Sequence, residues 1–128
     1  MLVLISAERA TLDDETNALR TERLACRLKR ERIPFERGRG TWGGRSEAVF
    51  AVTIPDWEQV NPLRKIACAF QQDALLIVQH EDAWLYWLWE QTHEDRMERV
   101  GPWREVSEAE AKAAGDWTEL GGRYWRAG

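Results

Sequence analysis

The pattern of hydrophobic and polar positions predicts short strands alternating with helices. Residues 2–7, 74–78 and 84–89 are nearly continuous apolar runs, which is typical of strands covered on both faces. Residues 34–39 and 48–54 predict an edge strand and the returning strand of a hairpin. Together these segments supply the strands of a small mixed fold.

The stretch from Gly38 to Glu47 joins the two strands of that hairpin and is the most distinctive part of the chain. It holds four glycines, two arginines and a tryptophan within ten residues. Because glycine lets the backbone approach a ligand closely, this loop is the first candidate for a binding site. Its glycines match neither a phosphate-binding loop followed by lysine nor a dinucleotide fingerprint leading into a helix.

A first helix is predicted over about residues 14–31, with Thr11 or Asp13 as its cap. Asn17 falls on the apolar face of this helix, one turn from its start. A buried carboxamide needs hydrogen-bond partners. Asn17 is therefore expected either to tie the helix start to a neighbouring loop or to reach a ligand.

A second helix is predicted to begin at Asn61-Pro62, with the asparagine as cap and the proline at the first helical position. It is expected to end near Gln72. Its apolar residues recur at the spacing of one helical face. These residues are Leu63, Ile66, Ala67 and Phe70.

The last third of the chain predicts a further hairpin and a short helix. Arg96 to Val100 is expected to pair back across a turn at Gln91 to Asp95. Ser107 and Glu110 have the spacing of a capping box, and Gly115 is placed to end the helix that they begin.

The order strand, helix, strand, strand, helix, strand predicts an α+β fold, the ferredoxin-like split βαβ sheet (β-α-β-β-α-β) with two helices on one face. Residues 117–120 and 123–125 flank two glycines and predict a closing hairpin in a Trp-rich C-terminal extension of strands and one short helix. We expect a single domain over 1–128, with the α+β core in 1–90 and the extension, 91–128, packed on that core.

Two helices can cover only one face of such a sheet, although its strands are apolar on both faces. The other face is expected to be covered in one of two ways. Either the C-terminal tail folds back over it through Trp103, Trp117 and Trp125, or a second copy of the chain covers it in a homodimer.

Composition and charge narrow the class of protein. At 128 residues and 44% hydrophobic, the chain has the size of one domain, and its net charge of −4 disfavours nucleic acid as a partner. It contains no membrane-spanning run, and its first residues lack the features of a signal peptide. Cys26 and Cys68 lie in no metal-binding pattern, which indicates reduced thiols and a cytoplasmic location.

Several polar residues are expected to meet at one end of the predicted sheet, because strand and helix directions alternate along the chain. The end of the first strand (Ser6), the start of the first helix (Asn17), the glycine-rich loop and the end of the second helix (Gln72) should all lie there. The alternative is a structural turn, in which polar side chains only tie the sheet end together.

The loop contributes groups that bind charged or planar ligands. Arg39 and Arg45 can pair with a carboxylate or a phosphate, unless Glu47 takes one of them as its own partner. Trp42 can stack on a ring, and the remaining polar side chains can orient the ligand. The sequence indicates no metal ligands and no cofactor. The predicted ligand-binding residues are Ser6, Asn17, Arg39, Trp42, Arg45, Glu47 and Gln72.

These residues also carry a resemblance to a known family. The chain resembles a family of short bacterial, phage and prophage proteins known as a domain of unknown function, over about residues 3–79. The resemblance implies polar site candidates at Asn17, Glu47 and Gln72, an origin in a phage or prophage, and a role in the host cytoplasm. The matching positions are Ile5-Ser6-Ala7, Asn17, Leu24, Leu28, the glycine-containing hairpin, Glu47, Phe50, Val52, Phe70 and Gln72-Asp73-Ala74.

Three functions are compatible with the sequence. The leading hypothesis is a small non-enzymatic binding module, counteracting a host process, that captures a small anionic or nucleotide-like ligand or a host protein at the glycine-rich end. The second is a small hydrolase or transferase with Glu47 as general base and an arginine stabilising negative charge. The third is an interaction protein or structural homodimer.

Overall fold

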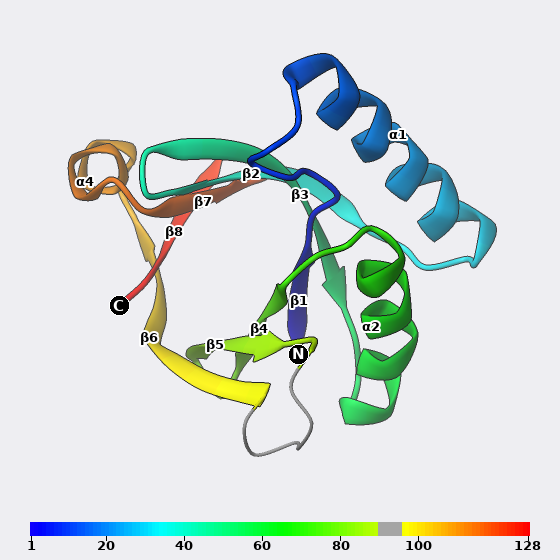
Figure 1. The fold of residues 1–128 in the computed structure, drawn as a ribbon. Helices are drawn as coiled ribbons and strands as arrows, with labels where there is room; N and C mark the ends of the chain where they lie inside the picture. Colours follow the sequence, from blue (N-terminus) through cyan, green and yellow to red (C-terminus); the bar gives the residue numbers. More distant parts are fainter. Residues whose placement is uncertain (90–95) are drawn as a thin grey trace.

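Eight strands form a closed β-barrel in the computed structural model, which describes residues 1–89 and 96–128 (Figure 1). They follow one another around the barrel in the order β1-β3-β2-β7-β8-β6-β5-β4, and every neighbouring pair is antiparallel. The strands are β1 (Leu2–Ile5), β2 (Glu36–Trp42), β3 (Arg45–Thr53), β4 (Ala74–Gln79), β5 (Asp82–Trp87), β6 (Met97–Val106), β7 (Trp117–Leu120) and β8 (Arg123–Ala127). The helices are α1 (Asp14–Arg30), α2 (Val60–Ala69) and α4 (Glu108–Ala114), with a 3₁₀ turn at Trp57–Gln59 before α2.

The predicted ferredoxin-like fold is wrong, because the sheet continues beyond the strands of the N-terminal part. β1 does lie between β3 and β4, with β2 beside β3 and with α1 and α2 on the outside (Figure 1). However, β2 pairs with β7 instead of forming an edge, and β4 pairs with β5. In an open sheet the backbone N–H and C=O groups along the outer edges of β2 and β4 would be exposed. In the closed barrel these groups form hydrogen bonds with β7 and β5. The residues expected as an extension supply β6, β7 and β8 of this barrel.

The strands are apolar on both faces because each face is buried in a different core. The outward residues of β1, β3 and β4 pack under α1 and α2; Phe50, for example, is 1% exposed and shares a cluster with Leu24 and Ile66. The inward residues form a second cluster inside the barrel, which we call the lumen. Trp103 and Trp125, which come from the C-terminal part of the chain, pack against this cluster, so the same chain covers both faces of the N-terminal strands.

A side-chain cap explains where α1 begins, whereas α2 begins without the cap that the sequence predicts. The side chain of Asp13 accepts the backbone N–H of Thr16 and caps α1. Asn61 was expected to cap α2, but the helix already begins at Val60, directly after the 3₁₀ turn. Asn61 lies within the helix and accepts hydrogen bonds from the Arg64 side chain instead. None of the helices within residues 1–89 and 96–128 combines the length and the apolar character needed to cross a membrane.

The C-terminal elements follow the signals read in the sequence. Ser107 accepts the backbone N–H three residues on, and Gly115 ends α4 in the left-handed region, with a φ of 86°. β7 and β8 pair around Gly121 and Gly122. β6 begins at Met97 and pairs with β5. The turn predicted at Gln91 to Asp95 lies outside the described residues.

The glycine-rich stretch is most of a β-hairpin, whereas we expected a loop. Only Gly43 and Gly44 form its turn, with φ values of 57° and 81°. Gly38 and Gly40 lie within β2. A Cβ atom on Gly38 would lie 2.3 Å from the carbonyl oxygen of Glu119 in β7. Glycine is therefore needed at Gly38 for the close approach of β2 and β7.

One buried hydroxyl in the barrel predicts a stabilising substitution. Thr118 is 1% exposed, and its Oγ1 has no hydrogen-bond partner among the described residues. Thr118→Val keeps the shape and removes the unpaired group, so we expect it to raise the free energy of unfolding by about 1 kcal/mol. Urea denaturation of the two proteins would measure the difference. A less stable variant would show that the hydroxyl has a partner, such as an ordered water.

Candidate functional site

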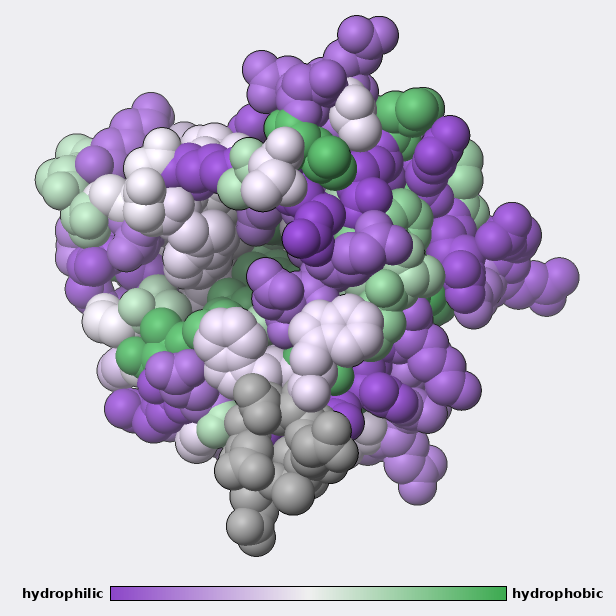
Figure 2. All heavy atoms as spheres, viewed as in Figure 1, coloured by the Kyte–Doolittle hydropathy of each residue, from purple (hydrophilic) through white to green (hydrophobic). Residues whose placement is uncertain are grey.

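The lumen opens into a cavity at each end of the barrel. The smaller cavity, which we call the Glu47 pocket, has a volume of about 330 Å³ and lies where β1 ends and β3 begins. The larger, which we call the wide mouth, has a volume of about 1350 Å³ and lies where β1 begins and β3 ends. Figure 2 shows that the centre of the ring of strands is hollowed and that apolar residues lie within the hollow.

The Glu47 pocket combines an apolar wall with a few polar groups, as ligand sites commonly do. Leu4, Val49, Leu76 and Leu85 form much of the wall, and all four belong to the lumen cluster or pack against it. Among the described residues that line this pocket, Glu47 is the one with an ionisable side chain. It occupies the position in β3 two residues before Val49, so the strand alternation turns it inward.

The environment of Glu47 disfavours its negative charge. Burial raises the pKa of the Glu47 carboxyl above its ordinary value; the charge of Arg45 opposes this effect, and the neighbouring carboxylate of Glu8 adds to it. The Arg45 guanidinium lies 3.3 Å from the Glu47 carboxylate, and the Ser6 hydroxyl lies 3.4 Å from it. A partly desolvated carboxylate in a cavity is typical of a functional group.

Glu8 is a member of the site that sequence reasoning missed. Its carboxylate accepts the backbone N–H of Ala48 and lies 3.5 Å from the Arg45 guanidinium, and its side chain is 15% exposed. Glu8 comes shortly after β1, and Glu47 lies near the start of β3. The antiparallel pairing of β1 with β3 brings them together, and this pairing was the available signal.

Three other predicted residues lie at the same pocket. The Ser6 hydroxyl donates to the Ala48 carbonyl at 2.9 Å. The Gln72 side-chain amide donates to the backbone carbonyl of Glu8 at 3.1 Å, and the backbone carbonyl of Gln72 accepts the indole N–H of Trp89 at 2.9 Å. Trp42 lines the pocket from the end of β2. Ser6, Trp42, Glu47 and Gln72 therefore meet at one cavity, with Arg45 at its edge.

Asn17 and Arg39 lie outside the pocket. The Asn17 side chain accepts the backbone N–H of Arg9 at 2.9 Å and donates to the carbonyls of Arg9 and Leu12. It is buried and ties the loop before α1 to that helix. Arg39 is exposed and alternates with Gly38 and Gly40, so it points to the outer surface of the barrel.

The charges of the pocket favour a cationic ligand over the anionic ligand expected from the arginines. Arg45 is shared between two carboxylates, so its positive charge is already balanced. Glu8 and Glu47, when both are ionised, carry one more negative charge than Arg45 balances, and Glu47 faces the apolar cavity, where an excess negative charge is costly unless a cation accompanies it. No group of three or more His, Cys, Asp or Glu residues that would suit a metal ion occurs in the described part of the chain.

Comparison with known families corrects the interpretation of the sequence. A model of the S-adenosylmethionine lyase family matches residues 3–128. The resemblance to a family of unknown function is therefore wrong, because the match is to a named family and includes the last third of the chain. The non-enzymatic binding module is wrong as well, because a lyase is an enzyme, and neither a hydrolase nor a transferase shares that reaction class. A search of curated proteins finds no match.

Proposed function

Because the chain belongs to the S-adenosylmethionine lyase family, we propose that it is an enzyme that cleaves S-adenosylmethionine without adding water, and that the Glu47 pocket is its active site. The observation that supports the location is the carboxyl group of Glu47. It lies in a cavity lined mainly by apolar side chains, and burial and the charge of Glu8 raise its pKa. Such a group matches a substrate that carries a positive charge.

The chemistry of the substrate explains why this site needs few catalytic groups. S-adenosylmethionine contains a sulfonium. When an oxygen of the substrate's own carboxylate displaces sulfur from carbon, the new carbon–oxygen bond closes a ring, and the electrons of the broken carbon–sulfur bond stay on sulfur, which leaves as a neutral thioether that requires no proton. The enzyme therefore has no need of a general acid for the leaving group. Its main tasks are to bind the cation, to hold the reacting atoms in position and to exclude water. The apolar wall of the pocket suits the last task.

We assign roles to the residues that meet at the pocket. Glu47 binds the positive charge of the substrate, and Arg45 orients the Glu47 carboxylate from the side. Trp42 offers an indole face to the adenine ring. Ser6 and Gln72 fix the polar wall, since both hydrogen bond to backbone or side-chain groups of the Glu8–Glu47 region.

Product analysis in isotopically labelled water tests the proposal. Purified protein is incubated with S-adenosylmethionine in H₂¹⁸O, and the products are followed by mass spectrometry from the earliest time points. We expect substrate loss proportional to enzyme, and initial products whose combined mass equals that of the substrate. Solvent oxygen in the initial product would indicate hydrolysis, and an unchanged substrate would refute the activity.

The pKa of Glu47 predicts the pH dependence. The raised pKa means that the carboxyl is protonated over a wider acidic range than an ordinary glutamate, and only the ionised form attracts a cation. We therefore expect kcat/KM to rise with pH through the pKa of Glu47. The bound cation lowers that pKa, so the rise in kcat should occur at lower pH. Rate profiles of the wild type and Glu47→Gln would check this, since the variant should lack the rise due to Glu47.

The compartment and the partners stay predictions. We propose a cytoplasmic location, which the unpaired state of Cys26 and Cys68 supports. The described residues that line the Glu47 pocket come from one copy of the chain, and a host protein partner and a homodimer stay predictions.

A further inference from the structure

The wide mouth of the barrel has the chemistry of a second binding site, and we propose that it binds an organic cation with an apolar body, such as a quaternary ammonium compound. This site lies at the end of the lumen opposite the Glu47 pocket and shares no lining residue with it. The inference thus goes beyond the proposed lyase activity. It depends on the aromatic groups, the charges and the backbone of the wide mouth.

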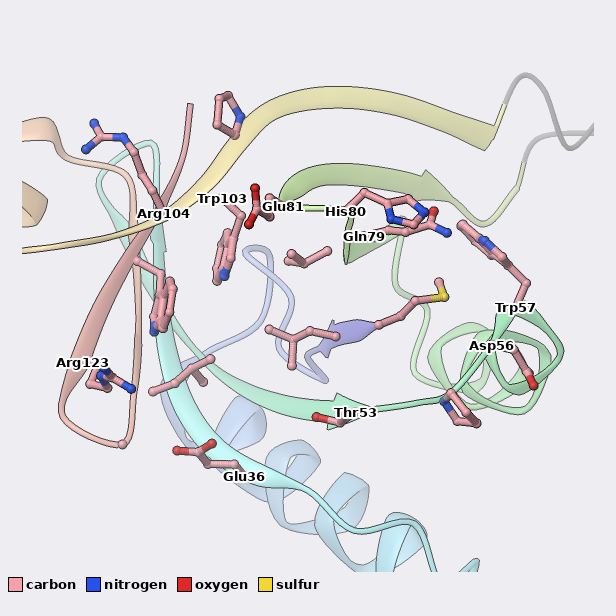
Figure 3. Close-up of a pocket in the computed structure, with 18 residues that line it drawn as sticks. Glu36, Thr53, Asp56, Trp57, Gln79, His80, Glu81, Trp103, Arg104 and Arg123 are labelled. Carbon is pink, nitrogen blue, oxygen red and sulfur yellow. The ribbon is translucent and has the colours of Figure 1, made fainter.

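Indole rings form the apolar part of the wide mouth. Trp103 and Trp125 lie parallel, with ring centroids 5.8 Å apart and planes within 3° of each other, and Trp57 lines the cavity from the side of α2 (Figure 3). The face of an indole carries negative electrostatic potential and attracts cations. Trp125 already makes such a contact, because the Arg123 guanidinium carbon lies 6.0 Å from its ring centroid.

The charged groups around the wide mouth leave an excess of unpaired carboxylates. Glu36, Asp56 and Glu81 line the cavity, and none of them forms a salt bridge with another residue of the described ranges. The positive groups are mostly compensated. Arg104 pairs with Glu110 at 3.1 Å and Arg123 pairs with Glu105 at 2.8 Å. The amino group of Met1 donates to the Ile54 carbonyl at 2.8 Å and keeps its charge, so the three carboxylates still exceed the uncompensated positive charge.

The turn between β4 and β5 brings one of these carboxylates to the part of the cavity where Trp103 lies. The backbone N–H of Trp103 donates to the Glu81 carbonyl at 2.7 Å, and Figure 3 shows the Glu81 side chain beside the Trp103 ring. A carboxylate next to an aromatic face attracts a cation through both groups. This corner of the cavity is therefore where we place the charged end of the ligand.

The same turn adopts a backbone conformation that its sequence disfavours. His80 and Glu81 have φ values of 51° and 67°, in the left-handed region that tight hairpin turns usually fill with Asn-Gly. Histidine is tolerated in that region, but glutamate is disfavoured there, so the turn carries strain at Glu81. Residues with strain of this kind cluster at ligand sites. Both side chains line the wide mouth, which supports a functional reason for keeping them.

Binding of a cation and its neutral counterpart tests the proposal directly. Choline and 3,3-dimethylbutan-1-ol have nearly the same shape, but only choline is charged. Titrations followed by the indole N–H signals in NMR should show choline binding about tenfold more tightly, with shifts at Trp103 and Trp125. Equal binding of the two compounds, shifts confined to Trp42, or no binding would overturn the inference. The measurement requires no catalysis, so its outcome is independent of the lyase activity.

Variants separate a binding role from a structural one. Glu81→Gln should weaken choline binding about threefold or more, whereas Glu47→Gln at the other pocket should leave it unchanged. The double variant His80→Asn/Glu81→Gly introduces the preferred turn sequence and removes the carboxylate. It should therefore be more stable to heat than the wild type and yet bind choline more weakly. An unchanged choline affinity in this stabilised variant would contradict the proposal.

Discussion

Glu47→Gln is expected to lower kcat/KM for S-adenosylmethionine about 100-fold. The substitution keeps the size and hydrogen-bonding capacity of the side chain but removes the negative charge that faces the pocket. Loss of a charge-assisted contact in a partly buried site corresponds to about 3 kcal/mol, which is roughly two orders of magnitude in rate. Initial rates measured over a range of substrate concentrations would give kcat and KM separately.

A stability measurement shows whether the loss is specific. Because the pKa of Glu47 is raised in the folded protein, its contribution to stability is present at acidic pH and is lost as the pH rises through that pKa. Above this range the charged carboxylate is a cost, so Glu47→Gln should be at least as stable as the wild type. Glu58→Gln is the matched control. It makes the same change at an exposed residue within the 3₁₀ turn Trp57–Gln59, away from the Glu47 pocket, and should keep full activity. Equal kcat/KM values in all three proteins would remove Glu47 from the mechanism.

Some of the predicted site residues lie at the pocket and others do not. The difference is whether the sequence alone determines the position of the side chain. Ser6, Glu47 and Gln72 could be placed at one end because they follow or precede strands whose directions alternate. Arg39 was misplaced because the glycine-rich stretch was expected to be a loop. In the hairpin Arg39 pairs with Ala48, and Glu47 pairs with the next residue, Gly40, so Arg39 points to the opposite face from Glu47. Asn17 could be assigned to a buried helix face, but its partners lie in an irregular loop that has no sequence pattern.

The fold shows the same division. The elements up to β4 could be read from hydrophobic periodicity and helix signals, since each depends on neighbouring residues. The closure of the barrel depends on pairings such as Gly38 with Leu120, which no local pattern reveals. Because several strands are apolar on both faces, the sequence indicated that other residues must cover the face of the sheet that α1 and α2 leave open. The sequence did not show that this cover consists of further strands in the same sheet.

The seam between β2 and β7 predicts the largest loss of stability. Gly38→Ala would place a methyl group 2.3 Å from the Glu119 carbonyl oxygen and 2.5 Å from the Leu120 side chain, and the first of these atoms belongs to the backbone. Separating the strands would disrupt the pairing that closes the barrel. We expect the free energy of unfolding to fall by about 3 kcal/mol, with a decrease in Tm of roughly 10 °C, measured by calorimetry or circular dichroism.

This substitution also distinguishes a closed barrel from an open ferredoxin-like sheet. In an open sheet β2 would be an edge strand, and an added methyl group at Gly38 would be neutral or slightly stabilising, because alanine loses less backbone freedom on folding than glycine. Arg39→Ala changes the next residue of the same strand on its exposed outer side and should alter stability by less than about 0.5 kcal/mol. A Gly38→Ala protein as stable as the Arg39→Ala protein would mean that β7 does not pack against β2 in solution.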